Sequence, residues 1–462
     1  MATLDRAIGP LAATLLVIGG IIGSGIFLTT GPMAAALPSP TLLILAWVLG
    51  SLFAVFGALT YAEMATMFPR SGGVYIFLRE AFGPLTGFLY GWATLLVVLA
   101  GGIAAVAVGF AEYFSYFFPS LSARQIVAEI PLGFTTVQIA RSQCVAVVAI
   151  AVLGVINYVG VKSGSATNAV LTVAKIAGLV LLPIFAIVSP QTSPAWAPIM
   201  PATEAGSAGS GVLSAFGVAL ISVLWAMEGY YFITYAAGEV RDPKRNLPRA
   251  LTLGLLTVMA IYVIVNLAYL YALPMDSLRG ASRVAEAAAT AMVGSAGATI
   301  IALTVLVSTL GADAAVILGA SRLFYAMAKD GLLLPAAAAI HPKYHTPHVA
   351  IVGITGWSSI LALSGTYEDL FTYVVFVSVL FSLLGGLALF RLRIDRPDAE
   401  RPYRAWGYPV VPIAFIAGAL FMVLNTLISK PVQSIAGLGI LAIGLPVYYW
   451  SRRTTGDDGS TS

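Results

Sequence analysis

The chain has 462 residues, of which 59% are hydrophobic and 10% are charged, and its formal net charge is +4. Soluble globular domains are roughly half apolar and about a quarter charged, so this composition excludes a soluble enzyme and indicates that a bilayer is the solvent. A helix needs about 20 apolar residues to cross a hydrocarbon core about 30 Å thick, so a single membrane domain of about twelve helices accounts for the length.

Apolar runs between charged or Pro/Gly-rich breaks predict the individual spans. The first run follows Pro10 and is too long for the apolar part of a signal peptide, so it is expected to remain as the first span. The polar residues 454–462 are expected to form a disordered tail. The predicted spans are residues 10–35, 41–66, 83–117, 138–158, 165–188, 211–238, 248–273, 292–328, 348–364, 367–390, 408–429 and 433–451.

The distribution of basic residues predicts the orientation. With an even number of spans both termini share a side, and the loops on that side contain most of the 24 lysines and arginines, including Arg241, Lys244 and Arg245. Basic loops stay in the cytoplasm, so both termini are predicted to be cytoplasmic. The same bias explains the basic balance of the chain, and no nucleic acid partner is expected.

Glycines interrupt two spans at equivalent places, in residues 19–25 of the first and 225–229 of the sixth. An inverted repeat of five plus five helices leaves this pattern, because the first helix of each half is broken near the bilayer midplane. The first repeat is then 10–188 and the second 211–390, with two more helices at 408–451, all within one transmembrane domain of residues 1–453. Packing of Gly19 and Gly23 against another helix, as in GxxxG pairs, is the alternative.

Seven strings, taken together, resemble one family. They are IGGIIGSGIF at 18–27, TYAEMATMFPRSGGVYIFLREAFGP at 60–84, LWAMEGYY and GEVRDPKRNLPRA within 224–250, SRLFYAMAKDGLLLP at 321–335, PKYHTP at 342–347 and RPYRAWGYPVVP at 401–412. They are similar to the amino acid, polyamine and organocation superfamily, and within it to bacterial permeases that resemble the L-type amino acid transporters. The resemblance implies the inverted-repeat fold in a cell membrane, here a bacterial inner membrane, with a free amino acid held between the first and sixth helices.

The ends of a broken helix carry partial charges of opposite sign, which suits a zwitterion. By resemblance, amides around Ser24 and Gly25 hold the substrate carboxylate, and the carbonyls of Ile21, Trp225 and Glu228 accept from its ammonium. The Trp225 ring is expected to cover the substrate as a gate, or else to be an ordinary packing aromatic. The predicted substrate-binding set comprises Ile21, Gly23, Ser24, Gly25, Trp225, Ala226 and Glu228.

Lys175 is a cation deep inside the fifth predicted span. It lies ten residues after Ser165, which at about 1.5 Å per residue is about 15 Å into the membrane. An unpaired lysine there costs at least about 2.5–3.5 kcal/mol, so partners are expected. The resemblance implies that Lys175 replaces a sodium ion, with backbone near Gly20 and the Ser308 hydroxyl as partners. Either Lys175 gains and loses its proton during the transport cycle, or it stays permanently charged and has a purely structural role.

Three other polar residues are singled out by position. Tyr262 resembles a family tyrosine that approaches the site from the position of a second sodium ion. Glu228 could pair with a cationic substrate or stay protonated, and Asp313 could carry a proton. The segment 239–249 mixes both charge signs and is expected either to anchor the inner end of the sixth helix by ion pairs or to be a solvated loop.

Several chemistries are excluded by what is missing. The chain has a single cysteine, Cys144, so no disulfide framework can form within it. The three histidines, His341, His345 and His348, lie together in a polar loop and are not expected to bind a metal. No cofactor is expected. Without a histidine base in a span, Ser24 is not expected to act as a protease nucleophile. Animal L-type relatives bond a glycoprotein subunit through a cysteine between the third and fourth spans. Residues 118–138 contain none, so no such heavy subunit is expected.

The sequence therefore predicts a sodium-independent transporter of L-amino acids that works by alternating access, with exchange as the leading mode. Proton-coupled symport is the first alternative. An antiporter of polyamines or cationic metabolites on the same fold is the second, although it would favour several cavity carboxylates. A membrane sensor with a transporter-like fold is the third, and it would normally need a signalling appendage.

Overall fold

The computed structural model describes residues 8–69, 72–131, 136–159, 165–189, 210–329, 333 and 335–454. Residues 190–209 of the long loop after the fifth predicted span, and 455–462 of the predicted tail, lie outside this set. The chain divides into two compact units. The first contains Met1–Ala81, Gly164–Ser308 and Val379–Pro431, and the second contains Phe82–Ser163, Thr309–Ser378 and Val432–Ser462.

The described residues contain nine helices that are long and apolar enough to cross a bilayer. Three shorter apolar helices, Thr172–Val188, Gly211–Ala226 and His348–Ser364, coincide with further predicted spans. The chain is therefore a multi-pass membrane protein. The nine longer helices are Pro10–Leu28, Pro40–Met67, Pro84–Phe117, Arg141–Val159, Pro243–Ala272, Val284–Lys329, Tyr367–Asp395, Val410–Ser429 and Pro431–Trp450.

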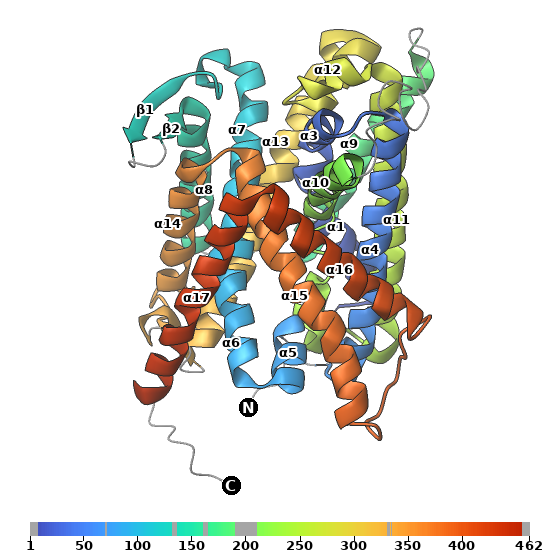
Figure 1. Ribbon diagram of the computed structural model, residues 1–462. Coiled ribbons are helices and arrows are strands. Elements are labelled where there is room, and N and C mark those ends of the chain that lie inside the picture. Colours follow the sequence, from blue (N-terminus) through green and yellow to red (C-terminus); the bar gives the residue numbers. More distant parts are fainter. Residues whose placement is uncertain are drawn as a thin grey trace. The chain divides into compact units, whose positions relative to one another are not determined.

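In the first unit, α11 lies along both α4 and α1, and α10 packs on α4 and α16 (Figure 1). Helix α4 begins where Pro40 fixes the first turn and the Ser39 hydroxyl caps it by accepting from the Leu42 amide. The elements of this unit are α1 Pro10–Ile21, α2 Gly25–Leu28, α3 Thr30–Ala36, α4 Pro40–Met67, α5 Val74–Phe82, α9 Ser165–Val188, α10 Ser210–Ala226, η3 Phe232–Glu239, α11 Pro243–Ala272, α12 Met275–Arg279 and α16 Val410–Ser429.

In the second unit, α7, α8 and α14 pack against one another (Figure 1). Strands β1 and β2 form an antiparallel hairpin between α7 and α8, in which Glu129 pairs with Gln138. The sequence predicted only a loop there. The elements of this unit are α6 Pro84–Ala93, the π-helix η1 Thr94–Leu99, α7 Ala100–Phe117, η2 Pro119–Leu121, β1 Ile126–Pro131, β2 Thr136–Ala140, α8 Arg141–Val159, η4 Pro335–Ala338, α14 His348–Ser364 and α17 Pro431–Thr454.

Two long helices, α13 Val284–Lys329 and α15 Tyr367–Asp395, contribute residues to both units. Within α13 the backbone leaves helical geometry at Gly294, where φ is 76°, a conformation that glycine adopts without steric cost. Helix α15 starts at a reciprocal cap, in which Thr366 donates to the Asp369 carboxylate and the Asp369 amide donates to the Thr366 hydroxyl. The break at Gly294 divides α13 into two helical parts, and the part after Gly294 coincides with the eighth span predicted at residues 292–328.

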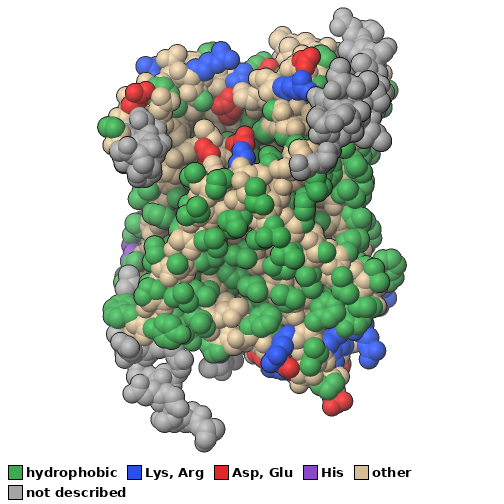
Figure 2. Space-filling model, in the orientation of Figure 1, with side chains coloured by type: hydrophobic (Ala, Val, Ile, Leu, Met, Phe, Trp, Pro, Cys, Tyr) green, Lys and Arg blue, Asp and Glu red, His purple; other side chains and the backbone are tan. Residues whose placement is uncertain are grey.

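Apolar side chains remain exposed along the helices. In α8, Val148, Val152 and Val155 are 62%, 52% and 63% exposed and share one face through their i, i+4, i+7 spacing. Figure 2 shows the same pattern, with hydrophobic side chains along the helices of this face and Lys, Arg, Asp and Glu gathered near their ends. Soluble proteins rarely expose such continuous apolar stripes, which fit contact with lipid chains.

Candidate functional site

The first helix is interrupted between α1 and α2. Ile22 has extended backbone angles, φ −71° and ψ 95°, and helical structure resumes at Gly25. Thr29, which joins α2 to α3, keeps right-handed helical angles, so the second half of this helix extends through Ala36. A helix end leaves carbonyls without intrahelical donors, and a helix start leaves amides without acceptors. The interruption therefore exposes both kinds of group at one place.

The sixth span is interrupted after α10 ends at Ala226. The chain turns through residues 227–231 and continues as the 3₁₀ segment η3. Gly229 has φ 96°, which a residue with a side chain rarely adopts. The Glu228 amide donates to the Trp225 carbonyl at 3.1 Å, closing a single turn. The sequence predicted an interruption of this span at residues 225–229, and α10 ends within that segment, at Ala226.

The two interruptions touch one another. A Cβ atom built on Gly25 would lie 2.6 Å from the Cα atom of Ala226, and one built on Gly229 would lie 2.7 Å from the Gly20 carbonyl oxygen. Neither position has room for a side chain, because the obstructing atoms belong to the backbone. Glycine at these two positions therefore allows α2 to approach the end of α10, and the turn after α10 to approach α1.

Lys175, on α9, reaches this interruption. Its side chain is buried, with 6% exposed, and its ammonium donates to the Ile22 carbonyl at 3.0 Å. The sequence placed the backbone contact near Gly20, whereas the carbonyl used is that of Ile22. Because Ile22 has left the helix, its carbonyl can turn toward a neighbouring helix. One turn before Lys175, Thr172 packs against Gly19.

Ser308, on α13, does not bond to Lys175 as predicted. Its side chain is 1% exposed, and its hydroxyl oxygen has no hydrogen-bond partner among the described residues. The Lys175 ammonium is directed to the Ile22 carbonyl instead. A buried hydroxyl without a partner is costly, so Ser308 stands out as a polar group that the described part of the chain leaves unsatisfied.

Helix α11 supports the interruption from another direction. The Tyr262 hydroxyl donates to the Ile21 carbonyl at 3.3 Å, and its ring contacts Trp47 edge-on. Further along α11, the Tyr269 hydroxyl donates to the Ile26 carbonyl at 3.3 Å, so α11 bonds to both halves of the broken helix. The sequence analysis named Tyr262 but missed Tyr269. The signal was present, because residues seven apart lie on one helix face.

Two of the predicted ammonium acceptors already accept hydrogen bonds. The Ile21 carbonyl accepts from Tyr262, and the Trp225 carbonyl accepts from the Glu228 amide. A carbonyl oxygen has two lone pairs, so one such hydrogen bond does not by itself exclude a second donor. The Trp225 side chain is 7% exposed, so it is enclosed by protein.

The Glu228 carboxylate lies in the unwound segment and is half-buried. It accepts a hydrogen bond from the Tyr231 hydroxyl at 2.5 Å. Tyr231 also contacts the rings of Tyr230 and Tyr61 edge-on, at 5.1 and 6.1 Å between centroids. The sequence analysis missed Tyr231, a polar partner held three residues from the carboxylate.

Comparison with known proteins shows the family of the chain. The family described as amino acid permease matches residues 8–450. The serine/threonine exchanger SteT of Bacillus subtilis is 31% identical over 97% of this chain and 98% of its own length. The human b(0,+)-type amino acid transporter 1 is 30% identical over 93% of this chain and 84% of its own, and the human large neutral amino acids transporter small subunit 2 is 29% identical over 97% and 82%.

The chain belongs to the amino acid permease family. The permease resembles L-type transporters within the amino acid, polyamine and organocation superfamily, as the sequence strings indicated. It is thus a membrane transporter and not an enzyme.

Asp313 lies in the second unit of the permease. It is on α13, five residues after Ser308, and its side chain is 2% exposed. Close by in the chain, the Ala314 carbonyl accepts from Asn157 on α8 at 3.4 Å. A buried carboxylate within an apolar helix is rare and is a candidate for proton transfer.

At the end of α4 the permease holds a buried carboxylate, that of Glu63. Glu63 is fully buried and accepts two hydrogen bonds from Arg393, at 3.0 and 2.6 Å, and one from the Ala405 amide at 2.6 Å. Arg401 lies 3.4 Å from the same carboxylate. Glu63 thereby fixes the segment after α15 to the end of α4.

The charged segment 239–249 makes one ion pair with this region. Lys244 lies 2.6 Å from Glu400, and the two side chains are 51% and 76% exposed. The backbone of the segment is also held by two hydrogen bonds: the Arg241 amide donates to the Ile8 carbonyl, and the Ile8 amide donates to the Glu239 carbonyl. Exposed pairs contribute little free energy, so the backbone bonds are the stronger anchor.

Proposed function

We propose that the permease is a sodium-independent transporter of L-amino acids that exchanges one amino acid for another by alternating access. The observation that carries the proposal is the contact between two interrupted helices, at Gly25 with Ala226 and at Gly229 with Gly20. Main-chain groups released at such a contact suit a ligand with one carboxylate and one ammonium. Similarity to a serine/threonine exchanger supports exchange as the mode.

The proposed substrate contacts follow the polarity of the helix ends. Amides of Gly23, Ser24 and Gly25 hold the carboxylate at the start of the second half of the first helix. The carbonyls of Ile21, Trp225 and Glu228 accept from the ammonium. Ala226 packs beside the substrate, and the Trp225 ring closes over it as a gate.

Sodium independence is assigned to Lys175. A fixed ammonium on the Ile22 carbonyl supplies the positive charge that a bound cation would otherwise supply at this interruption. The backbone of Gly20, the hydroxyl of Ser308 and the phenol of Tyr262 are proposed to complete this region. The Ser308 hydroxyl, which lacks a partner among the described residues, is then available to the ammonium in another state of the cycle.

Proton-coupled uptake is the second candidate, favoured by two carboxylates. Asp313 is buried on α13, and Glu228 accepts from Tyr231 at the helix interruption. Either could carry a proton with the substrate. Glu228 could instead pair with a cationic substrate, as an antiporter of polyamines or cationic metabolites would require.

The predicted topology accompanies this function. It consists of twelve helices in a five-plus-five inverted repeat, within one domain in a cell membrane such as a bacterial inner membrane, with both termini in the cytoplasm. No disulfide-linked heavy subunit is expected, because residues 118–138 lack a cysteine.

Purified permease in liposomes tests the proposal. Vesicles are loaded with unlabelled amino acid or left empty, and uptake of labelled L-serine, L-threonine, L-leucine and L-arginine is followed in sodium-free buffer. Exchange predicts uptake only into loaded vesicles, unchanged when sodium is added. Uptake into empty vesicles driven by an inward proton gradient would support symport instead, and no uptake of any amino acid would refute the proposal.

A further inference from the structure

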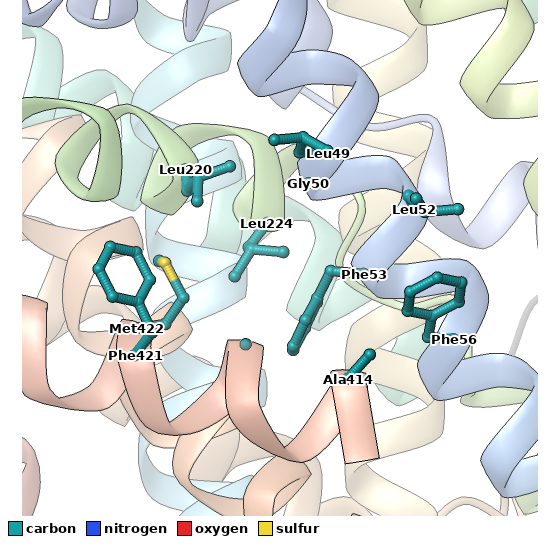
Figure 3. Close-up of a pocket in the computed structure, with 11 residues that line it drawn as sticks. Leu49, Gly50, Leu52, Phe53, Phe56, Leu220, Leu224, Ala414, Phe421 and Met422 are labelled. Carbon is teal, nitrogen blue, oxygen red and sulfur yellow. The ribbon is translucent and has the colours of Figure 1, made fainter. Parts of the chain in front are cut away.

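An apolar groove crosses the first unit between α4, α10 and α16. It encloses about 200 Å³, and Figure 3 shows its lining side chains converging from the three helices. Two glycines set its shape, since a Cβ atom on Gly50 would meet Val223 and one on Gly418 would meet Phe53. The side chains that surround it include Leu49, Phe53, Phe56, Leu220, Leu224 and Phe421.

The groove is continuous with the apolar surface that faces lipid. Leu49, in its wall, is 43% exposed. On two of the helices that form the groove, Leu45 of α4 is 42% exposed, and Leu420 and Leu424 of α16 are 45% and 50% exposed. All three helices that form the groove are apolar, and α4 and α16 are long enough to cross a bilayer. Whatever fills the groove must therefore enter from the hydrocarbon region.

We propose that this groove binds one acyl chain of a membrane lipid. Its lining residues carry no charged or hydroxyl side chain, so a polar headgroup has nothing to bind within it. Drug-sized ligands occupy pockets of about 300–1,000 Å³, so a volume of about 200 Å³ suits a narrow flexible chain better than a fused-ring lipid.

Binding of the acyl chain is driven by its van der Waals contacts with the groove walls and not by removal of the chain from water. An acyl chain in the bilayer is already in an apolar solvent, so the hydrophobic effect contributes nothing to its transfer. The groove walls, however, lose dispersion contacts wherever they face a void, and a chain that follows the groove restores them. Binding should therefore depend on how closely the chain fits the walls.

The position of the groove links it to the interrupted sixth span. Leu220 and Leu224 are on α10, and the residue after Leu224 is Trp225, the proposed gate. An acyl chain in the groove packs behind the last turn of α10 and holds it against α4. This second step rests on the proposed function, whereas the binding step does not.

Photolabelling of the full permease tests the binding step. The probe is a phosphatidylglycerol with a diazirine in one acyl chain, at increasing mole fraction in phosphatidylethanolamine vesicles, with labelled residues mapped by mass spectrometry. The expected result is saturable labelling of groove residues at low probe fraction, while labelling of the exposed α8 face at Val148, Val152 and Val155 rises in proportion to the probe. Proportional labelling at both places would overturn the proposal and indicate ordinary surrounding lipid.

Two alanines on α16 provide a matched pair of variants. Both are exposed, but Ala414 lines the groove and Ala417 does not. Ala414→Trp should abolish saturable labelling and alter the rate of exchange, and Ala417→Trp should leave both unchanged. If Ala414→Trp does not yield folded protein, Leu220→Trp fills the groove from α10 instead. Unchanged labelling in a folded groove-filling variant would overturn the proposal, and transport by the wild-type protein reports separately on the proposed function.

Discussion

The Lys175 ammonium donates a hydrogen bond to the carbonyl of Ile22, the residue at which the first helix ends. One buried cation thus contacts the main-chain group that the helix interruption releases. This arrangement needs no bound ion to satisfy the carbonyl, and it joins α9 to the centre of the proposed site.

Lys175→Met removes this donor while preserving most of the side-chain length. Leaving a buried carbonyl without its donor costs about 1–3 kcal/mol, so exchange should fall about tenfold or more. Exchange in sodium-free vesicles, with Lys343→Met in the exposed loop as the control, measures the effect. Exchange and pH dependence that match the wild-type protein would contradict the role assigned to Lys175.

Gly25→Ala tests the contact between the two interruptions. The added Cβ atom would lie 2.6 Å from Ala226 Cα, and overpacking of this kind costs about 1–3 kcal/mol. Exchange should be lost even where the purified protein remains monodisperse. Gly353→Ala is the matched control on α14, because its Cβ atom would meet nothing within 4 Å. Equal activity of the two variants would mean that the close contact is not needed for transport.

Glu228 and Tyr231 should act as a pair. A hydrogen bond to a charged group contributes about 1.5–3 kcal/mol, so Glu228→Gln and Tyr231→Phe should each weaken exchange. Because the residues share one bond, the double variant should lose less than the two single losses combined. Apparent affinity and maximal rate for the four proteins measure the coupling. Strictly multiplicative effects would show that the hydrogen bond at 2.5 Å does not matter for transport.

Arg393 and Arg391 differ in burial, although they are two residues apart on α15. Arg393 pairs with the fully buried Glu63, and breaking a buried pair costs about 3–5 kcal/mol. Arg391 pairs with Asp395 at the surface, where both side chains are 58% and 41% exposed, and such pairs contribute about 0–1 kcal/mol. Thermal unfolding in detergent should show a clear loss for Arg393→Ala and little change for Arg391→Ala. Equal shifts would refute the importance given to Glu63.

The helix interruptions could be predicted from sequence because glycine and apolar length have direct physical meanings. Glycine strings at 19–25 and 225–229 marked where both helices leave regular geometry, and Lys175 stood out because a buried cation requires a partner. The residues that support the site were harder to find. Tyrosines are common in membrane helices, so the sequence does not distinguish Tyr269 and Tyr231 from packing aromatics. Their roles become visible only from their hydrogen bonds, to the Ile26 carbonyl and to the Glu228 carboxylate respectively.

The errors have the same origin. The resemblance paired the Lys175 ammonium with the Ser308 hydroxyl, whereas the ammonium donates to the Ile22 carbonyl. That carbonyl is available because Ile22 has left the helix, and its direction depends on backbone angles that the amino-acid composition does not specify. The hairpin of β1 and β2 was missed because its pairing is between strands within a short polar loop, where no long apolar run marks it. Non-local geometry of this kind appears only in three dimensions.

Recognition of a zwitterion by main-chain groups is tested most directly by equilibrium binding to the purified protein. Three ligands are compared for each amino acid: the free form, its methyl ester without the carboxylate, and its N-acetyl form without the ammonium. The account predicts that at least one free L-amino acid binds and that both of its derivatives lose binding. Derivatives that bind as tightly as the parent would contradict it.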